Sequence, residues 1–373
     1  MKTEITRAQL AEAAQAVKGL VSKDGLSAFS KIRLDASGCL SVTGSNGDVQ
    51  VEWRLEDGEI ENTGTVTLPG AAFVSFVAAM PEGKVEIDDD DFGKKVRMRG
   101  GGVVFKLAAG EAIDFPMMAG PKDGAKAALH IGAALFREML RKVRFAVSTD
   151  ATRANLAGVN IDLKDGRLGM TATDGRRLAH VESIDVTDKA MLGMNVTLPT
   201  KTVAILYGLL ERMSDGDVYM VFDGSAVRIV GDKWGMTAKV LAAAYPDWHR
   251  VVPEDKRGTT HLIRMKRTMF LEAMGRAALA SDETGGVKIT IMNGRATFEA
   301  RNDITAAKTD MPVEDMDNVK CEFRVNPRLM KDALEVIDDD EFILHTDCGD
   351  STPLKLTCTV PWVAVIMPYR KEG

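Results

Sequence analysis

The sequence has 373 residues, of which 45% are hydrophobic and 27% are charged, so we expect two or three domains with cores of their own. A formal net charge of −6 argues against a protein coated with basic surface, although a local basic face stays possible. The chain contains no apolar run of about 18 residues and no apolar signal-peptide core near its start, so we expect a soluble, cytoplasmic protein.

The first third of the chain contains two segments with helical character among short strands. The pattern "TRAQLAEAAQAVKGL" (6–20) predicts a helix, and a second helix is expected in "TLPGAAFVSFVAAM" (67–80), where a proline precedes an apolar run. Between them, "SGCLSVTGSN" (37–46) is typical of a β-hairpin. "MRGGGVVFKL" (98–107) predicts another hairpin that turns at its glycines, and "AIDFPMM" (112–118) closes this part.

The same series of elements follows twice more. The second series has helices in "GAALFREMLRKVRFAV" (132–147) and "TLPTKTVAILYGLL" (197–210), and hairpins in "DGRLGMTATD" (165–174) and "VYMVFDGSAVRIVG" (218–231). The third has helices in "KRTMFLEAMGRAALA" (266–280) and "RVNPRLMKDALEVI" (324–337), and a hairpin in "NGRATFEARN" (293–302). The segments "AAYPDWHRVVP" (243–253) and "VIMPYR" (365–370) end the two series.

Three markers recur in one register, which indicates an internal repeat. Glycines in equivalent hairpins are separated by 166 − 38 = 128 and 294 − 166 = 128 residues. Prolines before equivalent helices are separated by 199 − 69 = 130 and 327 − 199 = 128, and the closing prolines by 246 − 116 = 130 and 368 − 246 = 122. We therefore predict an α+β fold of three repeated domains, over residues 1–123, 124–254 and 255–373, each with two helices packed on antiparallel sheets.

Charge is distributed unevenly between helices and loops. The helix within 132–147 carries Arg137, Arg141, Lys142 and Arg144 against one acid, Glu138. The helix within 266–280 also carries more basic than acidic residues. Such a face is either an ordinary solvated surface or a surface that contacts phosphates, and the sequence leaves both interpretations open.

The motifs of common enzymes are missing from the sequence. It has no P-loop, no His-Glu-x-x-His zinc motif and no Gly-x-Ser-x-Gly nucleophile motif. The aspartate runs at 88–91 and 338–340 are expected to be solvated hairpin tips, because calcium loops space their ligands at alternate positions. The five histidines lack ligand spacing, and the four cysteines are expected to be reduced core thiols. We therefore predict no metal and no cofactor.

Four segments carry a resemblance to a known family: "TRANLAGVNIDLKDGRLGMTATDGRRLA" (152–179), "YPDWHRVVP" (245–253), "VNPRLMKDAL" (325–334) and "VIMPYR" (365–370). With them, essentially the whole chain resembles the β sliding clamps of bacterial DNA polymerase III. The resemblance implies a non-enzymatic processivity factor that forms a closed, head-to-tail homodimeric ring around double-stranded DNA. It further implies that the DNA polymerase III α subunit, the clamp loader and other proteins dock through short peptides.

The resemblance also implies roles for individual residues. Those expected to face DNA are Lys23, Arg137, Arg141, Lys201 and Arg267. Those expected at the dimer interface are Phe105, Leu107 and Leu279. The expected peptide-binding pocket comprises Arg153, Leu156, Thr173, Gly175, Arg176, Arg177, Leu178, Pro246, Arg250, Val251, Asn326, Leu329, Val365, Ile366, Met367, Pro368, Tyr369 and Arg370.

Three pocket positions depart from the family pattern, and this bears on which peptides fit. The family commonly has His where this chain has Arg176, an aromatic residue at Leu329 and a second Met at Tyr369. Two alternatives to the clamp remain at this point. One is a metal-dependent enzyme with a carboxylate site at Asp174 or the aspartate runs, and the other is a three-domain adaptor that does not form a ring.

Overall fold

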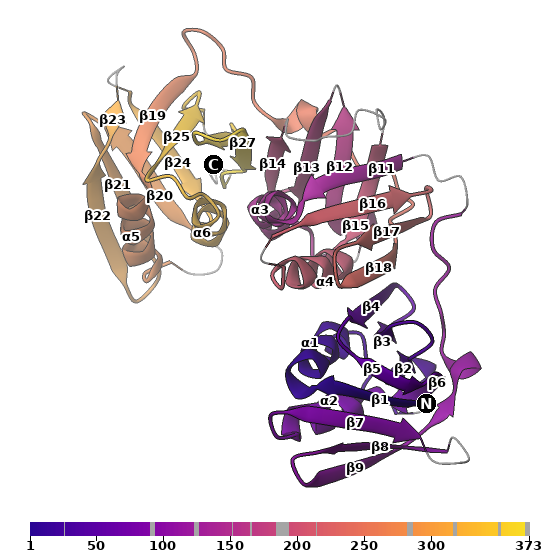
Figure 1. Cartoon of the computed structure of the whole chain (residues 1–373). Helices are drawn as coiled ribbons and strands as arrows, with labels where there is room; N and C mark the ends of the chain where they lie inside the picture. Colours follow the sequence, from indigo (N-terminus) through magenta and orange to yellow (C-terminus); the bar gives the residue numbers. More distant parts are fainter. Residues whose placement is uncertain are drawn as a thin grey trace. The chain divides into compact units, whose positions relative to one another are not determined.

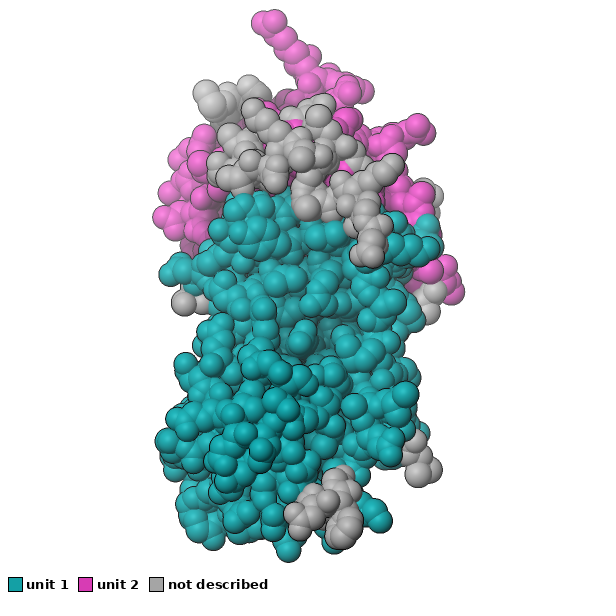
Figure 2. All heavy atoms as spheres, turned by 45° about the vertical axis from the view of Figure 1, so that its right-hand side comes forward, with its two compact units in different colours: residues 1–137, 186–191, 201–242 teal, residues 138–185, 192–200, 243–373 magenta. Residues whose placement is uncertain are grey.

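In a computed structural model the chain forms two compact units, which are coloured separately in Figure 2. The first contains residues 1–137, 186–191 and 201–242, and the second contains residues 138–185, 192–200 and 243–373. The residues that the structure describes are 1–25, 27–89, 94–122, 127–150, 152–164, 166–183, 194–213, 215–281, 286–315, 319–349 and 352–369.

The described residues contain six α-helices, two in each of the three repeats, as the sequence predicts (Figure 1). They are α1 (Arg7–Lys18), α2 (Gly70–Ala79), α3 (Ala133–Val143), α4 (Thr200–Leu210), α5 (Arg267–Ala278) and α6 (Pro327–Glu335). Only α6 has proline in its first turn. Pro69 and Pro199 are instead the last residues of the preceding strands, directly before α2 and α4, so a place in the first helical turn, which suits proline, holds for Pro327 and not for these two.

The first unit is built on two antiparallel sheets. One has five strands in the order β5-β1-β7-β8-β9, and the other has nine in the order β10-β6-β2-β3-β4-β18-β17-β16-β11. The bounds are β1 (Lys2–Thr6), β2 (Lys31–Asp35), β3 (Leu40–Ser45), β4 (Val49–Leu55), β5 (Glu59–Asn62), β6 (Thr65–Pro69), β7 (Lys84–Asp89), β8 (Lys95–Gly100), β9 (Val103–Ala108), β10 (Gly110–Glu111), β11 (Ala127–Gly132), β16 (Asp217–Phe222), β17 (Ala226–Val230) and β18 (Trp234–Lys239).

The second unit also has two antiparallel sheets. The larger has nine strands in the order β15-β12-β13-β14-β27-β26-β25-β19-β23, and the smaller has four in the order β22-β21-β20-β24. The bounds are β12 (Gly158–Lys164), β13 (Arg167–Thr173), β14 (Arg177–Ser183), β15 (Met194–Pro199), β19 (His261–Lys266), β20 (Val287–Met292), β21 (Arg295–Arg301), β22 (Ala306–Pro312), β23 (Glu314–Asp315), β24 (Cys321–Val325), β25 (Glu341–Thr346), β26 (Leu354–Thr357) and β27 (Trp362–Ile366).

The first helix of each repeat buries one apolar stripe. In α1 the buried residues are Leu10, Ala13, Ala14 and Val17, which recur at the spacing of a single helical face. Buried residues have the same spacing in α3 and α5: Phe136, Met139, Leu140 and Val143, and Phe270, Ala273, Met274 and Ala277. In α5 this stripe packs on the small sheet, where the ring of Phe270 meets that of Phe298 edge-on at 5.1 Å.

In each large sheet one strand pair joins one repeat to the next, and the two pairs have the same register. In the first unit β4 pairs with β18, so that Trp53 lies opposite Trp234. In the second unit β14 pairs with β27, so that Val181 lies opposite Trp362. Each residue of the second pair lies 128 positions after its equivalent in the first pair, since 181 − 53 = 128 and 362 − 234 = 128. The repeat therefore extends from the sequence to the junctions between its copies.

Two further expectations are wrong for particular residues. Asp88 is not part of a solvated tip: it is 7% exposed and pairs with Arg97 and Arg99 on β8. Cys39 is exposed rather than a core thiol, whereas Cys321 is buried.

Among the described residues, no helix combines the length and the apolar character needed to cross a membrane.

Candidate functional site

The corner between β13 and β14 is held by hydrogen bonds from its own side chains. The Thr173 hydroxyl donates to the Arg177 carbonyl at 2.7 Å and accepts from the Gly175 N–H at 3.1 Å. Asp174 Oδ1 accepts from the N–H groups of Arg176 at 2.8 Å and Arg177 at 2.9 Å. Gly175 has φ 82°, a value that suits glycine. The sequence Thr-Asp-Gly therefore fixes a tight corner with little freedom of its own.

Arg177 ties this corner to helix α6. Its Nη1 lies 2.6 Å from Asp332 Oδ2 and its Nε lies 3.1 Å from Asp174 Oδ2. The guanidinium also lies 5.3 Å from the centre of the Phe145 ring. Because neighbouring residues of a strand point to opposite faces, Arg177 and Leu178 project from different sides of the sheet. Arg177 thus supports the corner from behind rather than lining the same face as Leu178.

The chain's last strand and the residues after it lie directly beside the corner. In the β14–β27 pair, Leu178 lies opposite Val365 and Arg177 lies opposite Ile366. The Met367 N–H donates to the Arg176 carbonyl at 2.9 Å, which continues this ladder into the corner. Two segments about 190 residues apart in sequence thereby form one surface.

Apolar side chains of graded exposure cover this surface. Leu178 and Val365 face the same side of the sheet and form its floor, with 2% and 3% of each residue exposed. Met367 follows β27 and is 41% exposed. Val251 precedes the third repeat and is 53% exposed. Exposed methionine next to a buried apolar floor provides an adaptable contact surface.

The segment between the second and third repeats lies on the same face as Leu178. Trp248 stacks on His180, two residues beyond Leu178, with 3.9 Å between ring centres. The Tyr245 hydroxyl is buried close to the backbone of Thr173, and burial raises its pKa well above the usual value. The neighbouring residue Pro246 is thereby brought to the corner, whereas Arg250 is exposed and hydrogen-bonds Asp247 at 3.0 Å.

The other residues predicted for the pocket are held by contacts of their own or are partly buried. Arg153 Nη1 donates to the Asp174 carbonyl at 2.9 Å, and Leu156, three residues on, is half-buried. Tyr369 donates its N–H to the Arg324 carbonyl at 2.7 Å, and its hydroxyl accepts from Asn326 Nδ2 at 3.2 Å. Pro368 is buried and Leu329 is half-buried on α6. Arg370 lies outside the described residues.

The five cations predicted to face DNA differ in how they are held. Lys23 and Lys201 are exposed, and Arg137 is half-buried. Arg141 pairs with Glu138 at 2.7 Å and with Asp338 at 2.6 Å, and these carboxylates raise its pKa. Arg267 donates to the Asp339 carbonyl at 2.9 Å. The aspartate run at 338–340, which follows α6, therefore contacts two of these five cations, Arg141 and Arg267.

The residues predicted at the dimer interface lie on an edge strand and at a helix end. β9 is the last strand of the five-stranded sheet, and Phe105 on it stacks on Phe76 at 4.3 Å. Leu107 is only 3% exposed and contributes to the core. Leu279 follows α5 and is 85% exposed. The interface itself stays a prediction.

No group of three or more metal-ligating side chains occurs among the described residues. Both oxygens of the Asp174 carboxylate accept hydrogen bonds, from two backbone N–H groups and from Arg177. The carboxylate thus serves the corner.

Sequence reasoning missed the residues that support the site. Asp332 and Phe145 hold Arg177, and Trp248 holds the linking segment to β14. No local pattern identifies Asp332, since its partner is 155 residues away. Trp248 was available as a signal, because an aromatic residue in a polar linking segment calls for a packing partner.

Comparison with known proteins covers nearly the whole chain. Residues 1–119, 130–247 and 249–370 match the models of the N-terminal, central and C-terminal domains of the DNA polymerase III beta subunit. A beta sliding clamp of Staphylococcus epidermidis is 27% identical over 336 residues, which is 87% of each chain.

Solved structures agree with these matches. A beta sliding clamp of C. crescentus is 27% identical with a TM-score of 0.90, and the DNA polymerase III beta subunit of Pseudomonas aeruginosa is 24% identical with a TM-score of 0.91. Both comparisons cover 100% of each chain. The three-domain clamp fold and the family models together show that this chain belongs to the family of DNA polymerase III beta subunits, the beta sliding clamps.

Proposed function

We propose that the chain is a DNA sliding clamp that closes head to tail with a second copy into a ring around duplex DNA. The observation that carries this proposal is the strand junction that occurs twice within the chain, as β4 with β18 and as β14 with β27. Three repeats in a row make two such junctions and leave one unpaired strand of each kind at the two ends.

The unpaired strands are β22 and β9, which are the outer strands of the two smaller sheets. β22 corresponds to β14, because Ala296 lies opposite Met311 just as Leu168 lies opposite Ser183, 128 residues earlier. β9 corresponds to β18, because each follows a two-residue hairpin turn, after Gly100 and after Gly231. An unpaired edge strand is a liability that pairing with a second copy removes.

The two known junctions supply a register for the third. Val51 lies opposite Met236, and Ala179 lies opposite Ala364. The equivalent residues are Ala307 on β22 and Phe105 on β9, so we place Ala307 opposite Phe105 of the second copy. In that register Ala306 lies opposite Lys106, and Lys308 opposite Val104.

Leu279 fits the same scheme. The first helix begins at Ala133 in the second repeat and at Arg267 in the third, a displacement of 134, so Leu279 is the equivalent of Phe145. Phe145 lies at the junction between the second and third repeats, beneath Arg177. We infer that Leu279 occupies this place at the junction between subunits, where its exposed side chain becomes buried.

Enclosure explains how a clamp can hold DNA without tight contacts. We propose that Lys23, Arg137, Arg141, Lys201 and Arg267 face the duplex and make weak, exchangeable phosphate contacts that do not depend on base sequence. The carboxylates of Glu138 and Asp338 partly offset the charge of Arg141, and the Asp339 carbonyl occupies one donor of Arg267, which suits sliding rather than fixed binding.

The surface around Leu178, Val365 and Met367 is then the docking site for other proteins. We propose that it receives short peptides with a pair of apolar residues, as presented by the DNA polymerase III α subunit, the clamp loader and other DNA-processing proteins. These partners supply the chemistry, and we place the protein in the cytoplasm with them. Arg176, Leu329 and Tyr369 border this site and are expected to tune which peptides fit.

An engineered disulfide tests the proposed junction and its register. In a variant with Cys39→Ser, the pair Ala306→Cys and Lys106→Cys should form covalent dimers under mild oxidation, since directly opposite residues have Cα atoms about 5 Å apart. Non-reducing gel electrophoresis measures the yield.

A shifted pair provides the control for this test. Ala306→Cys with Val104→Cys is displaced by two residues, about 7 Å along the strand, which is too far for a disulfide. Equal cross-linking of both pairs, or of neither, would contradict the register.

A further inference from the structure

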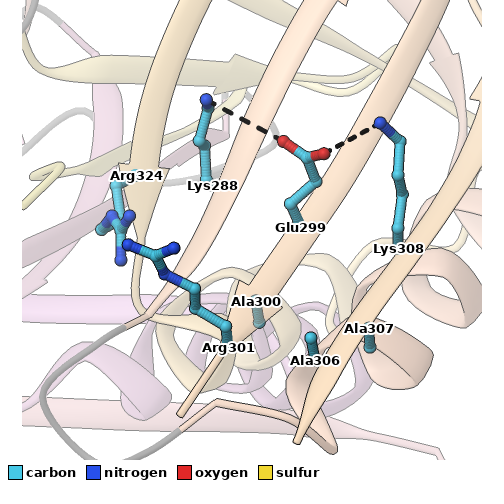
Figure 3. A pocket seen from close by; sticks show the side chains of 8 residues that line it. All are labelled: Lys288, Glu299, Ala300, Arg301, Ala306, Ala307, Lys308 and Arg324. Atoms are coloured by element: carbon cyan, nitrogen blue, oxygen red, sulfur yellow. Dashed lines mark ion pairs between the residues drawn. The ribbon is translucent and has the colours of Figure 1, made fainter. Parts of the chain in front are cut away.

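The exposed face of the small sheet β22-β21-β20-β24 has a hollow of about 470 Å³ that the clamp activity does not account for. Figure 3 shows the side chains around it. The residues that line it are Lys288, Glu299, Ala300, Arg301, Ala306, Ala307, Lys308 and Arg324. Four of the eight are cationic, and one is acidic.

The strand register places most of these charges in one row. Arg324 lies opposite Lys288, Lys288 opposite Glu299 and Glu299 opposite Lys308. Glu299 lies between the two lysines, 2.9 Å from Lys308 Nζ and 3.9 Å from Lys288 Nζ. Lys288 Nζ also lies 3.1 Å from Glu322 Oε2, so each of the two lysines has a carboxylate close by.

Two arginines add positive charge at one end of the hollow. Arg301 is exposed and lies two residues beyond Glu299, on the same face of β21. In Figure 3 the guanidinium groups of Arg301 and Arg324 point toward each other and away from Glu299, and both residues line the hollow. Like charges held close together favour an anion between them, and guanidinium groups bind carboxylates in two-pronged fashion.

This end of the hollow is continuous with the peptide-docking site. The Arg324 carbonyl accepts a hydrogen bond from the Tyr369 N–H at 2.7 Å, two residues after Met367. The Tyr369 ring packs against Gly286, where a Cβ atom would lie 2.5 Å from it, and Gly286 precedes Lys288 by two residues. Tyr369 therefore connects the segment that follows β27, which carries Met367, to β24 and to the residue before β20.

We propose that the hollow binds acidic residues that flank the apolar part of a docked peptide. The occupant is an Asp- or Glu-rich segment of the partner protein, selected by the excess of cations and placed by continuity with the docking site. This inference rests on the proposed function of that site. If β22 pairs with β9 of a second copy, the added strand extends the sheet at its edge and leaves this face open.

The expected gain is modest and depends on salt. Exposed ion pairs are individually weak, so we expect two or three of them together to tighten binding about 3- to 10-fold. Raising the ionic strength shortens the screening length, so the gain should largely vanish at about 1 M salt.

The test is a fluorescence titration of the full-length protein with three kinds of labelled peptide. One carries the apolar pair alone, the second adds four glutamates at either end, and the third adds four serines instead. The glutamate flank at one end should tighten binding 3- to 10-fold, and the serine flank should not. Arg301→Ser, alone or with Lys288→Ser, should remove the gain and leave the affinity of the unflanked peptide unchanged.

Arg295→Ser is the matched control, because Arg295 lies on the same strand and face and pairs with Asp310 at the other end of β21. This variant should retain the gain in affinity from the glutamate flank.

Unchanged affinity on adding glutamates, with the unflanked peptide still bound, would overturn this proposal and leave the docking site intact. Failure of the unflanked peptide to bind would overturn the docking site itself. Weaker binding of a labelled oligonucleotide to Arg301→Ser, with no effect on any peptide, would assign the hollow to nucleic acid and also overturn the proposal.

Discussion

Leu279→Asp should convert the dimer into monomers. Leu279 is 85% exposed in the single chain, so its replacement should cost the fold itself little. In the proposed ring the side chain is buried at the subunit junction, where a carboxylate without a partner costs several kcal/mol. We expect the dissociation constant to rise about 100-fold or more. Light scattering after size exclusion should give a mass near 40.4 kDa instead of twice that value.

Two further variants make this result specific. Ile113→Asp changes an equally exposed residue, 87% in the single chain, that lies away from the proposed junction, and it should remain dimeric. Phe105→Asp should give monomers, and circular dichroism must show that it is folded because Phe105 stacks on Phe76. A dimeric Leu279→Asp protein would contradict the assignment of this helix end to the interface.

Met367→Ala together with Leu178→Ala should abolish peptide binding. We expect a peptide with an apolar pair to bind the unaltered protein at micromolar strength, about 8 kcal/mol. Removing the exposed Met367 side chain alone should weaken binding about tenfold, because apolar contact area is lost. Removing the floor residue Leu178 as well should leave no measurable affinity in a fluorescence titration.

Stability must be separated from binding in this experiment. Leu178 is 2% exposed, so its truncation should also lower the free energy of unfolding by about 2 to 5 kcal/mol. Met292→Ala is the control for Met367→Ala, because Met292 is 45% exposed on a different strand and its loss should not affect the peptide. Undiminished binding by the folded double variant would place the docking site elsewhere.

The repeat is the feature that the sequence predicts best. Equal spacing of Gly166 and Gly294 corresponds in the structure to hairpins whose strands pair in the same register, with Lys164 opposite Arg167 and Met292 opposite Arg295. The hairpin at Gly38 has a longer connection, with Asp35 opposite Ser41, so its register differs by one residue. This works because hairpin turns and buried helical stripes are local, and each depends on a few residues with special φ values or a fixed period.

Contacts between distant residues could not be predicted in this way. Arg177 meets Asp332 across 155 residues, and nothing around Asp332 marks it as a partner for a corner in another repeat. The burial of Asp88 could not be predicted for the same reason. Its partners Arg97 and Arg99 lie on the next strand, and the sequence does not distinguish them from ordinary surface charges. Proline before a helix also has two roles that sequence does not separate, as Pro69 and Pro327 show.

The resemblance identified the docking residues but not their separate roles. It grouped Arg177 with Leu178, whereas the alternation of strand residues places them on opposite faces. The structure therefore divides the predicted pocket into a floor at Leu178 and Val365, an exposed rim that includes Met367, and a support at Arg177.

The central claim is that a closed ring holds DNA by enclosure, and topology tests it most directly. The disulfide-closed dimer of the Ala306→Cys and Lys106→Cys variant is formed by oxidation in the presence of nicked circular plasmid and then washed with about 1 M salt, which removes phosphate contacts. We predict that the protein stays with the circular plasmid through gel filtration and is released when one restriction cut makes the plasmid linear. Release from the circle in high salt, or equal retention on circular and linear plasmid, would contradict enclosure.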